Sequence, residues 1–195
     1  MKKFIFAFLA ALPLVLATPA KAEPMTYTFD TVHSQVIFYV MHRGFSNSEG
    51  EFLEFDGDFT FDPDRPEDGS VNVTIDTTSL TMDDEVWTDH TKTKFFNTDE
   101  FKTMTFKSTK VLKTGENTAL LTGDLTMLGV TKPVTLDVKL NKVEKDDEGD
   151  STAGFSATGK LKRSDWGMDY GLGMIGDEVE LRIEVEANAK GGTNE

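Results

Sequence analysis

The run Val179-Glu180-Leu181-Arg182-Ile183-Glu184-Val185-Glu186 alternates apolar and charged side chains without a break. Successive side chains of a β-strand point to opposite faces, so this run predicts a strand with one buried face and one wet face. Seven runs upstream carry a similar apolar pattern. The eight runs cover residues 36–41, 53–61, 71–75, 104–108, 121–127, 134–140, 155–161 and 179–186.

Eight such strands must bury their apolar faces against one another. They can do so as a closed barrel or as two stacked sheets, and alternation alone does not choose between them. The stretch 82–101 is charged, polar and aromatic without alternation. Asp83 is placed to cap a short helix there, with Asp84 and Glu85 in its first turn. We therefore predict an all-β chain with one or two helical turns in this connection.

The composition sets limits on the class of protein. The chain has 195 residues, which is typical of a single domain, and 38% hydrophobic residues with 15 Phe can build a core. The absence of Cys excludes disulfides, thiolate metal sites and a Cys nucleophile. A formal charge of −14 argues against binding to nucleic acid or to anionic lipid headgroups.

The first 22 residues predict a cleavable export signal. Met1-Lys2-Lys3 is positively charged, Phe4–Leu16 is an apolar run of 13 residues, and Ala20-Lys21-Ala22 fits a signal-peptidase site. The run is shorter than the ~20 residues that span a bilayer, which argues against the alternative of an uncleaved anchor. Cleavage after Ala22 leaves 17 basic against 34 acidic residues, a formal charge of −17.

No internal repeat or linker divides the rest of the chain. We expect one domain over 23–190 and a frayed tail over 191–195. The exported protein is expected to be soluble and to have no membrane-spanning segment.

Motifs for catalysis or metal binding are missing from the sequence. The three His residues, His33, His42 and His90, form no HExxH or other closely spaced pair. His33 and His42 are nine residues apart, so in one regular strand they would face opposite sides. The sequence therefore predicts no metal and no cofactor.

The aromatic residues are the main candidates for function. Twelve Phe remain after removal of the leader, and six of them lie on alternating strand positions: Phe38, Phe55, Phe59, Phe61, Phe106 and Phe155. An eight-stranded barrel is just wide enough either to fill with such side chains or to hold one small ligand. Gly57, Gly123 and Gly159 share the apolar faces, where a glycine marks a kink or leaves room for a ligand.

A series of short motifs runs through the chain in order. It begins with His33-Ser34-x-Val36-x-Phe38-x-Val40-x-His42. The later motifs are Gly50-Glu51-Phe52, 57–62, His90, Phe95-Phe96, 105–109, 123–134, Gly154-Phe155-x-Ala157, 163–167 and 176–179. In these motifs the chain resembles the YceI family of periplasmic, lipocalin-like polyisoprenoid-binding proteins. It departs from the family pattern in the sequence Trp87-Thr88-Asp89-His90-Thr91 and at Lys102, where a Pro is usual.

The resemblance implies a single antiparallel eight-stranded lipocalin-like barrel around a long apolar tunnel. It implies a ligand that is a polyisoprenoid or similar long-chain amphiphile, such as an isoprenoid quinone or a fatty acid derivative, held for transport or storage. It implies no enzyme chemistry. From their alternating positions, we expect the tunnel to be lined by Phe38, Phe55, Phe59, Phe106, Leu125, Met127 and Phe155.

Two other functions remain open. An enzyme could use His42, Asp89 or His90 as a general acid or base at the mouth of the barrel. A barrel filled with its own side chains could act as a stress-linked interaction protein. The sequence leaves open whether the chain forms a homodimer.

Overall fold

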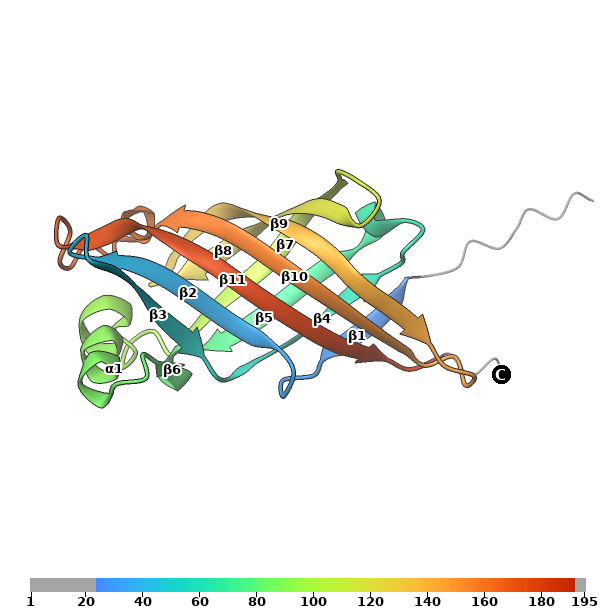
Figure 1. The fold of residues 1–195 in the computed structure, drawn as a ribbon, viewed down its shortest axis with the longest axis horizontal. Helices are drawn as coiled ribbons and strands as arrows, with labels where there is room; N and C mark the ends of the chain where they lie inside the picture. The colour runs from blue at the N-terminus through green and yellow to red at the C-terminus, as the bar shows by residue number, and fades with distance from the viewer. Residues whose placement is uncertain (1–23, 192–195) are drawn as a thin grey trace, which may run out of the picture.

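The computed structural model describes residues 24–191, which form one sheet rolled around a long axis (Figure 1). The predicted leader over 1–22 and residues 192–195 of the predicted tail lie outside the described part of the chain. The strands are β1 (Met25–Phe29), β2 (Gln35–His42), β3 (Ser46–Phe52), β4 (Phe55–Phe61), β5 (Ser70–Asp76), β6 (Leu80–Thr81), β7 (Thr103–Lys113), β8 (Thr118–Met127), β9 (Val130–Lys145), β10 (Ser151–Lys162) and β11 (Ile175–Ala189). The helical segments are η1 (Pro66–Asp68), η2 (Thr77–Ser79), α1 (Glu85–Thr91), η3 (Lys92–Phe96) and η4 (Arg163–Trp166).

Eight of these strands close into a ring. The sheet runs β1-β4-β5-β7-β8-β9-β10-β11, and β1 pairs in turn with the end of β11, where Phe29 lies opposite Ala187. Every pairing in the ring is antiparallel. The predicted eight-stranded antiparallel barrel is confirmed.

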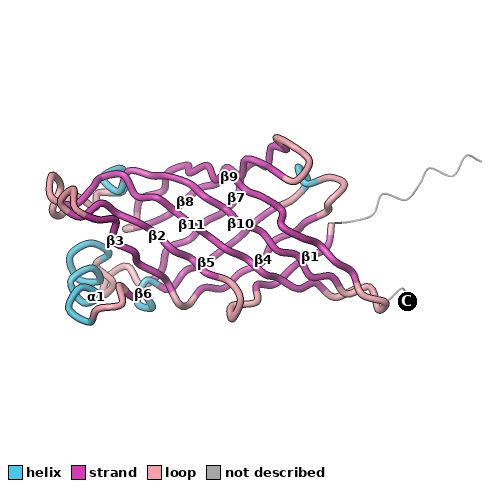
Figure 2. Tube along the Cα trace, in the orientation of Figure 1, coloured by secondary structure: helices cyan, strands magenta, loops and turns pink. Residues whose placement is uncertain are grey.

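The remaining three strands extend the wall at one end. The first part of β11 pairs with β2, which pairs with β3, and β3 pairs with β6. Figures 1 and 2 show α1 at this same end, which we call the α1 end. The prediction counted β2 among the barrel strands, whereas β1 takes that place in the closed ring.

The predicted alternation is visible in the burial of the strands. In β9, Val134 and Leu136 are buried, whereas Thr135 and Asp137 are exposed. Leu53 departs from the prediction: it lies in the turn between β3 and β4 and is 56% exposed. A two-residue turn here redirects the chain from the extension of the wall into the closed ring.

The predicted helix forms one residue later than expected. Asp84, not Asp83, caps α1 by accepting a hydrogen bond from the backbone N–H of Trp87 at 2.9 Å. Asp83 has a positive φ of 58° and lies before the cap. A π-helical turn, η3, follows and buries Phe96. Within the described residues, no helix is both long and apolar enough to cross a bilayer.

Candidate functional site

An elongated cavity of about 600 Å³ occupies the inside of the barrel. Every strand of the ring contributes to its wall, β1 through Phe29. Residues of β2, β3 and α1 complete the wall. Most of these side chains are aliphatic or aromatic. A continuous apolar lining of this kind is typical of sites for apolar small molecules.

All seven predicted lining residues lie on the wall of this cavity. They come from five strands, and each projects from the inward-facing side of its strand. Phe106 and Phe155 are only half-buried although they lie inside the barrel, because part of each ring faces the cavity. The seven are Phe38 on β2, Phe55 and Phe59 on β4, Phe106 on β7, Leu125 and Met127 on β8, and Phe155 on β10.

The inward-facing glycines make room for neighbouring side chains. A Cβ on Gly123 would lie 2.4 Å from the ring of Phe106, and one on Gly159 would lie 2.6 Å from Leu136. Gly57 has a φ of +146°, and a Cβ there would meet the backbone oxygen of Asn72 at 2.1 Å. The space over Gly123 and Gly159 is therefore used for packing of the wall, and Gly57 serves the close approach of β4 to β5.

The cavity reaches the surface at the α1 end. The exposed residues on its wall are Val86, Trp87, His90, Tyr170 and Met174, which belong to α1 and to the loop between η4 and β11. We call this set the mouth. Alternation did not predict the mouth, because these residues lie in segments without a regular apolar pattern.

Aromatic edge contacts hold the two histidines of this end. The ring of His42, at the end of β2, lies 5.4 Å from that of Trp87. The ring of His90 lies 6.0 Å from Phe95 and 5.4 Å from Tyr170. His42 and His90 both line the cavity, as the enzyme alternative requires, and both pack there against aromatic rings.

At the opposite end, four aromatic rings pack across the barrel. Tyr27 stacks on Phe59 with ring centroids 5.0 Å apart, and Phe155 meets Phe59 and Phe61 edge-on at 5.6 and 5.1 Å. The hydroxyl of Tyr27 is hydrogen-bonded to Ser151 Oγ at 2.8 Å. We call Tyr27, Phe59, Phe61 and Phe155 the aromatic floor. Phe59, Phe61 and Phe155 lie on the wall of the cavity at this end.

Arg163 of η4 anchors the loop that carries Tyr170 and Met174. It is 2% exposed, and its guanidinium donates to the backbone oxygens of Gly176, Ile175, Tyr170 and Met168. Burial lowers the pKa of Arg163, while the charges of Asp177 and Asp169 act in the opposite direction. The guanidinium is therefore hydrogen-bonded to the backbone of this loop and of the start of β11.

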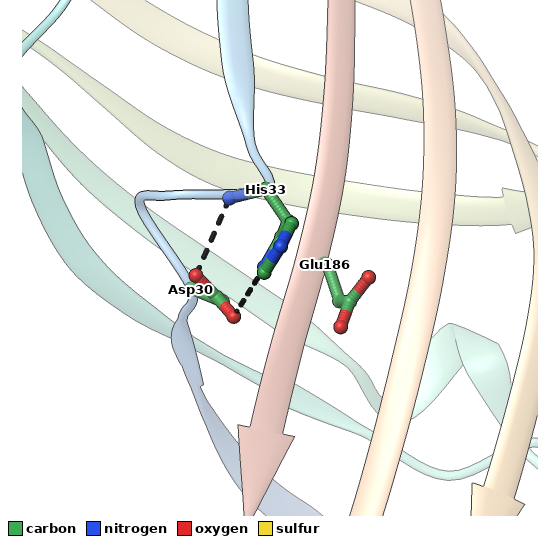
Figure 3. Close-up of side chains that lie close together, drawn as sticks. All are labelled: Asp30, His33 and Glu186. Carbon is green, nitrogen blue, oxygen red and sulfur yellow. Dashed lines mark hydrogen bonds and ion pairs between the residues drawn. The ribbon is translucent and has the colours of Figure 1, made fainter.

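A separate polar group lies on the outside, at the turn between β1 and β2. Figure 3 shows Asp30 and His33 facing each other, joined by a hydrogen bond of 2.8 Å between Asp30 Oδ2 and His33 Nδ1. Asp30 Oδ1 accepts from the backbone N–H groups of Val32 and His33. The carboxylate of Glu186 lies close enough for the three side chains to hold a metal ion in principle. The existing bonds to Asp30 already give the group a structural role in closing the turn.

His33 and His42 do not form one site. His33 lies in the turn before β2 and is exposed, whereas His42 ends β2 and contributes to the cavity wall near the mouth. The whole length of the strand separates them, so the predicted lack of a shared histidine site agrees with their placement.

The family model and the similar sequences point to the same family. Residues 27–187 match the family model described as the YceI-like domain. Protein YceI of Escherichia coli O17:K52:H18 is 40% identical over 187 residues, which cover 95% of this chain and 97% of the relative.

Solved structures show the same barrel. The crystal structure of Burkholderia cenocepacia BcnA has a TM-score of 0.72 at 26% identity and covers 81% of this chain and 98% of its own. A polyisoprenoid binding domain from Saccharophagus degradans has a TM-score of 0.63 at 16% identity and covers 85% and 99%. The second likeness is one of fold alone.

Proposed function

The chain belongs to the YceI-like domain family, and on that premise we propose that it is a periplasmic binding protein for a polyisoprenoid or similar long-chain amphiphile. The ligand's chain occupies the barrel cavity, and the protein serves as its carrier or store. The Saccharophagus degradans domain, which shares the fold, is described as binding polyisoprenoid.

The apolar cavity of about 600 Å³ is the observation that carries this proposal. A long hydrocarbon chain is insoluble in water, and each CH₂ group that it buries contributes ~0.8 kcal/mol. A protein that filled its own barrel would have no such space, so the cavity favours binding over the interaction-protein alternative. The seven predicted lining residues supply contacts to the chain, and we propose no catalytic step.

The proposed location rests on the leader at residues 1–22. We expect the mature protein to begin at Glu23 and to be recovered from the periplasm. N-terminal sequencing of the purified protein checks this, and a membrane-bound product that retains Met1 would contradict it.

Thermal denaturation of delipidated protein tests the binding function. An isoprenoid quinone at about 100 times its Kd should stabilise the fold by ~2.7 kcal/mol, since it binds only the native state. For a domain of this size that corresponds to a rise in Tm of about 5–10 °C. A Tm that stays unchanged with isoprenoid and straight-chain lipids alike would overturn the proposal.

A further inference from the structure

Ser48 carries a buried hydroxyl without a hydrogen-bond partner. It lies on the inward-facing side of β3, is 8% exposed and belongs to the cavity wall. Within the described part of the chain, no group pairs with its Oγ. Buried polar groups are nearly always hydrogen-bonded, and an unpaired one carries a free-energy cost that a partner would remove.

Hydroxyls at the other end of the barrel are paired. Thr60 and Ser70, which also line the cavity, are hydrogen-bonded to each other at 2.9 Å. Tyr27 in the aromatic floor is bonded to Ser151. The two ends of the cavity therefore differ. These hydroxyls at the floor end are hydrogen-bonded, whereas the hydroxyl of Ser48 at the α1 end is an unpaired donor.

Ser48 lies just inside the mouth. It pairs across the sheet with Val40, and the next inward-facing position toward the α1 end on β2 is His42, which touches Trp87. A serine hydroxyl moves among three staggered rotamers, so it can turn toward an atom in the cavity. A polar group that stopped at the level of Ser48 would remain close to the mouth.

The wall offers little positive charge to such a group. Among the described residues that line the cavity, Arg163 is the one Lys or Arg, and its guanidinium is bound by four backbone carbonyls. A buried carboxylate or phosphate without a cation would lose much hydration free energy. An uncharged oxygen has no such requirement.

We infer that Ser48 donates a hydrogen bond to an uncharged oxygen at the polar end of the ligand, such as a carbonyl, ether or hydroxyl oxygen. The polar end thus lies inside the mouth, and the apolar chain runs toward the aromatic floor. This assignment rests on the proposed function and adds to it the chemistry and the direction of the ligand.

The strand register gives the length available below Ser48. Val40, opposite Ser48, pairs with Val179 on β11, and Val185, six residues further along β11, pairs with Phe155 of the floor. At ~3.4 Å per residue, these six steps correspond to about 20 Å along the strand. The chain beneath the polar end therefore has room to lie extended.

Three probes with the same straight chain test the assignment: an alkane, a methyl ketone and a fatty acid. Their affinities are measured by displacement of an apolar fluorophore from wild type, Ser48→Ala and Ser70→Ala. Ser48→Ala should weaken ketone binding roughly three- to tenfold and leave alkane binding unchanged, since it removes one hydrogen bond. Ser70→Ala, which removes a hydroxyl at the other end that is already paired with Thr60, should keep the wild-type ratio of ketone to alkane affinity.

The outcomes separate this inference from the proposed function. If no probe binds wild type, both are overturned. If all bind but Ser48→Ala keeps the wild-type ketone-to-alkane ratio, the role of Ser48 is wrong and lipid binding stands. Fatty acid binding at neutral pH as tight as ketone binding would overturn the uncharged polar end. A Tm of Ser48→Ala at or above that of wild type shows that the variant folds.

Discussion

Phe106 illustrates how a single side chain can be part of both the wall and the site. Its ring lies over Gly123, where an added Cβ would come within 2.4 Å, and another part of the ring faces the cavity. The side chain is only half-buried although it lies inside the barrel. Its packing is therefore incomplete until a ligand fills the space.

Truncation should distinguish Phe106 from a true core residue. Large-to-small changes in a filled core cost ~2–5 kcal/mol, and we expect a loss in that range for Leu80→Ala, since Leu80 is 1% exposed. Phe106→Ala should reduce the stability of the empty protein by less than half of the ~3–5 kcal/mol typical of a buried Phe, and should weaken lipid binding. Urea denaturation of both delipidated variants checks this. An equally large loss for Phe106→Ala, with lipid binding unchanged, would contradict the cavity role.

His33 and Asp30 form the turn that leads from the closed ring into the extended wall. The hydrogen bond from Asp30 raises the pKa of His33, and the same bond lowers the pKa of Asp30. The contribution of His33 to stability is present below its unfolded pKa of about 6.5 and is lost as pH rises through the higher folded value. The contribution of Asp30 is present above about 3.9 and is lost as pH falls through its lower folded pKa.

A titration of the imidazole measures this coupling directly. In proton NMR, His33 should titrate with a midpoint above about 6.5, and Asp30→Asn should lower that midpoint because the charged partner is gone. The side chains of His33 and Asp30 are 63% and 23% exposed, so we expect the pKa shift to report on this turn and not on the barrel as a whole. A wild-type midpoint at or below that of the urea-unfolded chain would show that the hydrogen bond is absent in solution.

At the scale of elements, the strands that the sequence predicts are those with alternating apolar residues. β3 was missed because its inward-facing positions are Ser48, Gly50 and Phe52, which give almost no hydrophobic signal. A Cβ on Gly50 would lie 2.2 Å from the ring of Phe38, so the small residue accommodates a neighbour's side chain. Pairing across strands, which determines this fit, is invisible in a single run of sequence.

The candidate site, like the strands, was predictable only in part. The apolar wall follows from alternation, and the seven expected residues do lie on it. The mouth and the aromatic floor depend on which loops and strand ends meet in space, as do the contacts of Tyr27 and Tyr170. Ser48 was missed for another reason, because only the structure shows that its hydroxyl lacks a partner.

The aromatic floor should set the longest chain that the cavity accepts. Phe59→Trp adds bulk to a cluster in which Phe59 already touches Tyr27 and Phe155, so the longer ring should protrude into the cavity and reduce the affinity for long chains. Phe155→Ala should have the opposite effect and extend the preferred chain length. Affinities for a series of chain lengths check both changes, with the Tm of each empty variant as a control for folding. A shared optimum for wild type and both variants would show that the floor does not limit the chain.

At the scale of the whole molecule, the barrel has a direction. The mouth and the extended wall of β2, β3 and β6 lie at the α1 end, and the floor lies at the end where β1 closes the ring. Among the described residues, most acidic and basic side chains lie at outward-facing strand positions and in loops, while the wall of the cavity is mostly apolar. The formal charge of the whole sequence is −14. Such a charge favours solubility and opposes contact with anionic surfaces.

Native mass spectrometry of the protein purified from the periplasm without detergent tests the central claim most directly. We expect a species heavier than the mature chain by the mass of one long-chain lipid, which organic extraction removes and readdition restores. The fragmented ligand should carry an isoprenoid or other long hydrocarbon chain. If the protein shows only the mass of the mature chain, both as purified and after incubation with isoprenoid and straight-chain lipids, the cavity is not a lipid site and the proposed function is wrong.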